Sequence, residues 1–144
     1  MADMEQLRQI YSRYEEQIKK AYKKSSVLDG LWGMGNDPRN HPCNSEFFEN
    51  VEQWSQEFVQ GKPAPEQALE AVNWILRAPG DNKKAHTYWY YYAAQIHTFD
   101  IIPFLNPDDC ALLVKWYDEA FPKRDRLPNH IKLYDRLRKR AKGK

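Results

Sequence analysis

The sequence predicts a single compact all-α domain, an irregular bundle of five or six helices with a long ordered loop between helices 1 and 2. Apolar residues recur at the three- and four-residue spacing of helices along most of the 144-residue chain. Proline and glycine divide the chain into segments of helical length. The aromatic segment 86–92 has strand propensity, but no alternating partner segment or hairpin turn accompanies it. The chain length suits one core, so residues 1–144 are expected to form one domain.

Helix 1 is expected over about residues 4–24. Asp3 and Gln6 have the spacing of a capping box, in which each side chain bonds the backbone N–H of the other residue. Glu15 and Lys19 form an i,i+4 ion pair in the favourable order. The buried stripe of this helix is expected to be Leu7, Tyr11, Tyr14, Ile18 and Ala21 or Tyr22.

A long loop is expected over residues 25–44, because three glycines and two prolines interrupt the helical periodicity there. Loops longer than about 12–15 residues are uncommon in compact domains and are often functional. The loop retains four large apolar residues, so we expect it to be ordered and packed down by these side chains. They are Leu28, Leu31, Trp32 and Met34.

Helices 2 and 3 are expected to be joined by a tight connection. Helix 2 should follow a cap at Asn44 or Ser45 and end before Gly61. Its predicted buried stripe is Phe47, Val51, Trp54 and Phe58. Helix 3 should have Pro65 in its first turn and stop before Pro79. Its predicted buried residues are Ala68, Val72, Ile75 and Leu76.

Five consecutive aromatic residues, at positions 88–92, predict that helix 4 is the central element. The helix should start after Asp81 or Asn82 and end near Ile102, before Pro103. At about 100° per residue, five successive rings point in every direction, so this helix cannot lie with one face in water. A helical wheel assigns Tyr88, Trp89, Tyr92, Ile96 and Phe99 to the core face, whereas Tyr90 and Tyr91 point elsewhere.

Helix 5 has the strongest start signal in the chain. Asn106 is a cap residue, Pro107 occupies the first position, and Asp108 and Asp109 lie at the positive end of the helix dipole. The predicted buried stripe is Leu113, Trp116, Tyr117 and Ala120, with Cys110 at its edge, and Pro122 closes the helix. The basic helix 6, over about residues 128–142, should carry Ile131, Tyr134, Leu137 and Ala141 on one face.

The leading candidate site combines the long loop with a second stripe of helix 4. His86, Tyr90 and His97 share this stripe, and small alanines leave space between them for an anionic or aromatic ligand. The alternative is that the stripe and the loop simply pack on the bundle. The candidate binding residues are Trp32, Met34, Arg39, Asn40, His41, Cys43, His86, Tyr90, Tyr91 and His97. We therefore expect a non-enzymatic binding or protein-interaction module with an unknown protein or small-molecule ligand and no cofactor.

An enzyme that uses Cys43 with His41, or the helix 4 histidines, is the less favoured alternative. A cysteine nucleophile needs a histidine that is itself held in place by a third group. His86 and His97 lie about 16 Å apart along a helix axis, too far to share one metal ion. The four histidines and two cysteines include no CxxC or HxxxH spacing, so no metal site is expected.

The C-terminal segment suggests nucleic-acid binding as a further alternative. The last 22 residues hold ten Lys/Arg and two Asp, a net charge of +8, within a chain whose total is +2. Such cations can contact phosphates without reading sequence. The residues concerned are Arg136, Arg138, Lys139, Arg140 and Lys142. No known nucleic-acid-binding motif is present, and a solvated helix face explains the same pattern.

Composition also sets expectations about compartment and assembly. No run of about 18 apolar residues occurs, and the charged N-terminal segment lacks the apolar core of a signal peptide. We therefore expect a cytoplasmic protein without a membrane span, in which Cys43 and Cys110 are free thiols. A second copy of the chain is one candidate partner, because surplus aromatic surface on a small domain is often covered by a homodimer interface.

Overall fold

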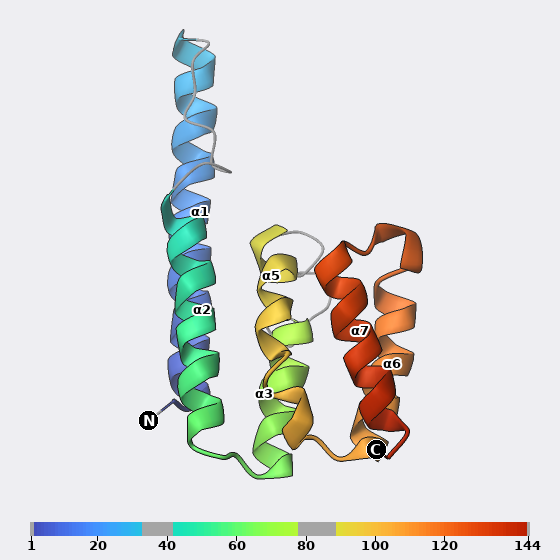
Figure 1. Ribbon diagram of the computed structural model, residues 1–144. Coiled ribbons are helices and arrows are strands. Elements are labelled where there is room, and N and C mark those ends of the chain that lie inside the picture. Colours follow the sequence, from blue (N-terminus) through green and yellow to red (C-terminus); the bar gives the residue numbers. More distant parts are fainter. Residues whose placement is uncertain (1, 33–41, 78–88, 144) are drawn as a thin grey trace.

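The described chain is all helical, and its helices form three pairs that lie side by side (Figure 1). The computed structural model describes residues 2–32, 42–77 and 89–143. Its α-helices are α1 (Met4–Trp32), α2 (Pro42–Gln60), α3 (Pro65–Arg77), α5 (Trp89–Ala94), α6 (Pro107–Ala120) and α7 (Pro128–Ala141). Short 3₁₀ helices are η2 (Gln95–Thr98), η3 (Ile102–Phe104) and η4 (Lys123–Asp125). The described ranges contain no strand, so the predicted all-α bundle is confirmed.

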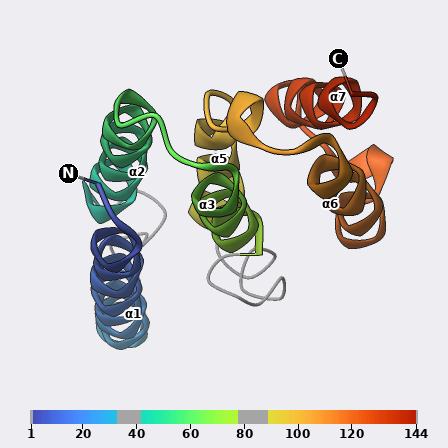
Figure 2. The ribbon, with the colours of Figure 1, turned by 90° about the horizontal axis from the view of Figure 1, so that it is seen from below.

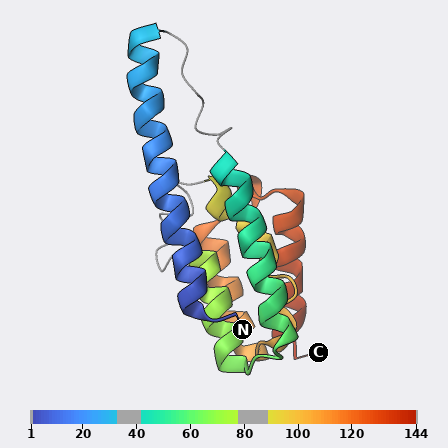
Figure 3. The ribbon, with the colours of Figure 1, turned by 90° about the vertical axis from the view of Figure 1, so that its left-hand side faces the viewer.

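The three pairs follow the order of the chain. Viewed from one end of the bundle, α1 pairs with α2, α3 with α5, and α6 with α7, and the α3–α5 pair lies in the middle (Figure 2). The helices α1 and α2 run antiparallel and cross at an angle, and α1 rises beyond the start of its partner (Figure 3). The central pair therefore has one helix pair on each side of it.

The start of α1 agrees with the sequence, whereas its end does not. The Gln6 N–H donates to Asp3 Oδ1 at 2.9 Å and the Asp3 N–H donates to Gln6 Oε1 at 3.2 Å, so the capping box is confirmed. The helix then continues through Gly30 to Trp32, so the predicted loop does not begin at residue 25. A glycine inside a helix costs only about 1 kcal/mol, which a 29-residue helix can absorb.

The helix α2 begins earlier than expected, at Pro42. Asn44 is therefore not a cap: it lies inside the helix, buried, where its Oδ1 accepts a hydrogen bond from the Tyr14 hydroxyl at 2.7 Å. The apolar stripes of α2 and α3 are confirmed, since every predicted member is buried. A short connection over residues 61–64 joins these two helices, as predicted.

Tyr91, rather than Tyr92 alone, anchors the aromatic core. Its side chain is fully buried, with ring centroids 5.1 Å from Tyr11 on α1 and 5.6 Å from Phe47 on α2. The Tyr11 ring also packs edge-on against Trp74 of α3 at 4.5 Å. Aromatic rings from α1, α2, α3 and α5 thus meet in one cluster. The helical wheel that pointed Tyr91 away from the core was wrong.

The predicted long helix 4 is broken in the structure. The α-helical geometry of α5 ends at Ala94 and gives way to η2, a turn and η3. Gln95, fully buried, holds this segment: its Nε2 donates to the Leu76 carbonyl at 3.2 Å, and its Oε1 accepts from the Tyr117 hydroxyl at 3.1 Å. The helix changes from α to 3₁₀ geometry at Gln95, so the residues after it are rotated relative to Tyr91. A helical wheel drawn with one uniform pitch does not represent this rotation.

The last pair has the predicted bounds, but of the face predicted for α7 only Leu137 is fully buried, and Tyr134 and Ala141 are partly buried against the core. The Asn106 carbonyl accepts the first helical bond of α6 from the Cys110 N–H at 3.1 Å. On α7 the buried residues are His130, Leu133 and Leu137, whereas Ile131 is 45% exposed. The hydrophobic pattern missed this face because its first member is a histidine.

Arg126 ties this pair together. Its Nε donates to the Phe121 carbonyl at 2.8 Å, and its Nη2 forms an ion pair with Asp118 Oδ1 at 2.9 Å. The guanidinium also lies 4.2 Å from the centroid of the Tyr134 ring, and the Tyr134 hydroxyl donates to the other Asp118 oxygen at 2.7 Å. A buried arginine therefore links the end of α6 to α7.

Candidate functional site

Much of the binding surface predicted from the sequence falls outside the described residues. The candidate binding residues that lie outside the described ranges are Met34, Arg39, Asn40, His41 and His86. Trp32 is the last residue of α1, and its side chain is also outside the described set.

Two predicted binding residues are interior groups. The Cys43 side chain is 2% exposed, and burial, as the main cause, raises the pKa of its thiol. The Tyr91 ring is enclosed by aromatic rings, and its hydroxyl donates to Glu15 Oε2 at 3.2 Å. These side chains contribute to packing in this structure and present no surface to a ligand.

His97 and Tyr90 are half-buried and lie in different elements, η2 and α5. The His97 ring packs against Phe48 with centroids 4.3 Å apart, and its Nε2 has no hydrogen-bond partner among the described residues. Burial lowers the pKa of His97, which favours the neutral imidazole. His97 thus packs against α2, and Tyr90 is partly buried against the core.

His130 is a second buried imidazole, which the sequence analysis did not single out. Its ring stacks on Tyr92 with centroids 3.7 Å apart, and its Nε2 lies 2.7 Å from the Tyr92 carbonyl oxygen. A carbonyl oxygen only accepts, so Nε2 must carry the proton, and the buried Nδ1 has no partner among the described residues. Burial, as the main cause, lowers the pKa of His130. This histidine is a packing residue whose burial disfavours the charged form.

The described residues offer little for metal or thiol chemistry. Within residues 2–32, 42–77 and 89–143, no three His, Cys, Asp or Glu side chains lie close enough to hold a metal ion. Cys110 is buried, and burial raises the pKa of its thiol to about 11. A thiol of this kind is not a ready nucleophile at neutral pH.

The basic helix α7 uses several of its cations internally. The Arg140 Nε donates to the Leu105 carbonyl at 2.8 Å. The Arg136 guanidinium lies 4.7 Å from the Phe99 ring centroid, and that of Arg138 lies 5.8 Å from the Tyr134 ring centroid. Lys139 and Lys142 are exposed. Two of the five cations predicted to contact phosphates, Arg136 and Arg140, therefore also help to hold α7 against the bundle, whereas Arg138 contacts a ring of α7 itself.

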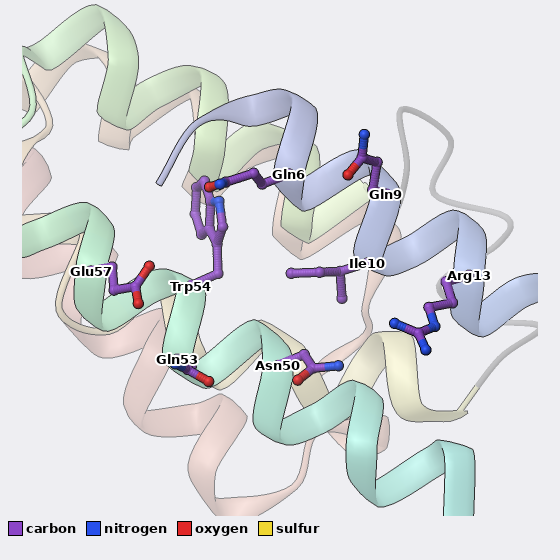
Figure 4. Close-up of a pocket in the computed structure, with 8 residues that line it drawn as sticks. All are labelled: Gln6, Gln9, Ile10, Arg13, Asn50, Gln53, Trp54 and Glu57. Carbon is purple, nitrogen blue, oxygen red and sulfur yellow. The ribbon is translucent and has the colours of Figure 1, made fainter. Parts of the chain in front are cut away.

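An open cleft between α1 and α2 is a candidate site that the sequence analysis missed. It has a volume of about 450 Å³, within the range typical of ligand sites (Figure 4). Four residues come from each helix, at spacings that place them on one flank. The lining residues are Gln6, Gln9, Ile10, Arg13, Asn50, Gln53, Trp54 and Glu57.

Two hydrogen bonds fix how the walls of the cleft face each other. The Trp54 indole N–H donates to the Asp3 carbonyl at 2.8 Å, and the Tyr14 hydroxyl donates to Asn44 at 2.7 Å. They join the start of α1 to the later part of α2, and the middle of α1 to the start of α2. This antiparallel register brings the two polar flanks together.

The lining groups are arranged by type. Arg13 and Glu57 lie at opposite ends of the cleft, and Ile10 and the Trp54 ring lie between them (Figure 4). The remaining four lining residues are amides, each of which both donates and accepts hydrogen bonds. Among the described residues that line the cleft, Glu57 is the only carboxylate, and none is a histidine or a cysteine. The cleft is therefore suited to binding a polar ligand and lacks an acid–base pair.

Comparisons with known proteins provide no relative: no family model, curated protein or solved structure matches the chain significantly. In the part of the chain that the structure describes, no helix combines the length and the apolar character needed to cross a membrane. Any functional conclusion therefore depends on the geometry of the site itself.

Proposed function

We propose that this protein is a non-enzymatic binding module and that its ligand site is the α1–α2 cleft. The observation that carries the proposal is an open cleft of about 450 Å³ whose lining combines amides, two opposite charges and an apolar centre. A few polar groups around an apolar surface are typical of sites that bind and orient a ligand. This keeps the interpretation drawn from the sequence but moves the site from the loop to the cleft.

The walls of the cleft support the proposal because they are held in place before a ligand arrives. Both walls are α-helices, and the bonds from Trp54 to Asp3 and from Tyr14 to Asn44 tie them together. The Trp54 side chain is only 4% exposed, so its ring is fixed by the core. A site that is already ordered loses less conformational entropy on binding.

A titration followed by NMR tests the proposal. ¹⁵N-labelled protein is mixed with pools of capped peptides and of small polar fragments. The reporters are the indole N–H of Trp54 and the side-chain amides of the lining residues. The variant Gln53→Trp should fill the cleft, and Gln56→Trp, an exposed position on the same helix outside the cleft, is the matched control.

Ligands of the proposed site should shift the reporter signals in the wild type and in Gln56→Trp, and not in Gln53→Trp. The proposal is wrong if all bound compounds shift signals elsewhere, or if Gln53→Trp binds them as the wild type does.

A further inference from the structure

We infer that the cleft binds an extended peptide segment of a partner protein. This segment carries an acidic residue at position i, an apolar residue at i+2 and a basic residue at i+4. The inference rests on the proposed function, because it names the class of ligand for the same cleft. It follows from the separation of the two charges, the chemistry of the amides and the apolar centre.

The charges at the ends of the cleft are far apart. Arg13 adjoins Tyr14, which bonds Asn44, and Glu57 lies one turn after Trp54, which bonds Asp3. Asp3 and Tyr14 are separated along α1 by about 16 Å, at about 1.5 Å per residue. A free dipeptide spans only about 7 Å even when fully extended. The backbone of one amino acid or dipeptide is therefore much shorter than this length of cleft, whereas about five residues of a longer chain match it.

The amides favour an extended segment over a helical one. Gln9, Asn50 and Gln53 offer paired donors and acceptors, the same groups that a peptide bond presents, and Gln6 adds the donors of its Nε2 while its Oε1 accepts from the Asp3 N–H. In an extended segment, successive N–H and C=O groups are free to bond them. In a helix these groups already bond each other, so the amides would find no backbone partner.

The order of charged and apolar groups sets the side-chain pattern of the ligand. In an extended chain, residues i, i+2 and i+4 point to the same side and span about 13–14 Å between their Cα atoms. An acidic side chain at one end then meets Arg13 and a basic one at the other meets Glu57. The middle residue lies over Ile10 and the edge of the Trp54 ring (Figure 4).

Charge variants and designed peptides test this inference by NMR titration. The probe is a capped nonapeptide with the core Asp-Ser-Leu-Ser-Lys between flanking Gly and Ser residues. A second peptide carries Asn and Gln in place of Asp and Lys, and a third places Asp and Lys next to each other. The first peptide should bind at least about tenfold more tightly than either control. The uncharged peptide loses both charged contacts, and the peptide with adjacent charges cannot form both at once.

Variants of the protein assign the two ends. Arg13→Glu should weaken binding of the first peptide about tenfold, since an attraction becomes a repulsion. Arg8→Glu makes the same change of charge on α1 outside the cleft and should leave binding unchanged. A peptide with Lys at both ends should restore binding to Arg13→Glu, which a merely unfolded variant would not do.

The outcomes separate the two proposals. The peptide inference would be overturned if fragments or other peptides occupied the cleft without a preference for the spaced charges and without any effect of Arg13→Glu. The proposed function would still stand in that case. A preference for helical peptides would also overturn it. Absence of any ligand shift at the cleft signals would remove both.

Discussion

Two buried tyrosines on α1 allow a direct measurement of what an unpaired hydroxyl costs this fold. Tyr11 and Tyr14 lie one turn apart, and each is almost fully buried. The Tyr14 hydroxyl donates to Asn44 at 2.7 Å, whereas the Tyr11 hydroxyl has no partner among the described residues. Burial raises the pKa of Tyr11 far above its usual value, so the group stays neutral and uncompensated. The substitutions Tyr11→Phe and Tyr14→Phe each remove one oxygen and keep the ring.

The expected changes in unfolding free energy differ between the two variants. Leaving a buried polar group unpaired costs about 1–3 kcal/mol, and a formed hydrogen bond contributes about 0.5–1.5 kcal/mol net. Tyr11→Phe removes an unpaired group and should leave the stability unchanged or raise it by about 1 kcal/mol. Tyr14→Phe deprives the buried Asn44 oxygen of this donor and should lower the stability by about 1–2 kcal/mol.

Urea unfolding followed by far-UV circular dichroism measures both changes under the same conditions. The wild type and the two variants should show the same dependence on urea, with the midpoint of Tyr11→Phe at or above that of the wild type and the midpoint of Tyr14→Phe below it. If Tyr11→Phe destabilised the protein as much as Tyr14→Phe, the Tyr11 hydroxyl would have a partner and the reasoning would be refuted.

Buried ionisable groups make the stability of this fold sensitive to pH and to substitution. Because burial lowers the pKa of His130, the unfolded chain takes up a proton below pH 6.5 before the folded one does, and stability falls as the pH falls. In urea unfolding this loss should be steeper in the wild type than in His130→Gln by up to about 1.4 kcal/mol per pH unit, and parallel pH profiles would contradict it. Arg126→Lys should lower the stability measured by calorimetry by about 1–3 kcal/mol, since lysine cannot bond the Phe121 carbonyl and Asp118 while covering the Tyr134 ring. An unchanged melting temperature would argue against this role of Arg126. Cys43 and Cys110 should react with a thiol reagent near pH 8 only after urea is added, whereas rapid labelling of the native protein would show that they are not buried.

Elements with local start and stop signals could be predicted from the sequence. The Asp3–Gln6 capping box and the prolines that begin α3, α6 and α7 mark positions where backbone geometry depends on a few neighbouring residues. The apolar stripe of α2 was also readable, because each member lies on one face at helical spacing. The fold class followed from these signals together.

Features set by distant contacts could not be predicted in this way. The break after Ala94 depends on Gln95 reaching Leu76 and Tyr117, which lie 19 and 22 positions away. The buried face of α7 depends on His130 stacking on Tyr92 across the bundle. A hydrophobic pattern counts neither residue as core, since both bury polar side chains whose partners come from other helices.

The cleft escaped prediction for a related reason. On each helix its lining looks like an ordinary solvated flank: a Gln, Asn, Arg or Glu every three or four residues. The spacing of polar residues at i, i+3 and i+7 on two adjacent helices was the available signal. Only the register set by the Trp54 and Tyr14 bonds shows that the two flanks face each other.

The buried side chain of Gln95 also has a consequence for how the protein opens. It bonds the last turn of α3 and a tyrosine of α6 at the same time, from a segment between them. Moving either helix away would leave amide or hydroxyl groups unpaired in an apolar interior. Partial unfolding that releases one pair alone is therefore costly, and amide protons in α3 and α6 should exchange with solvent through a shared opening. One glutamine thus links the middle helix pair to the pair formed by α6 and α7.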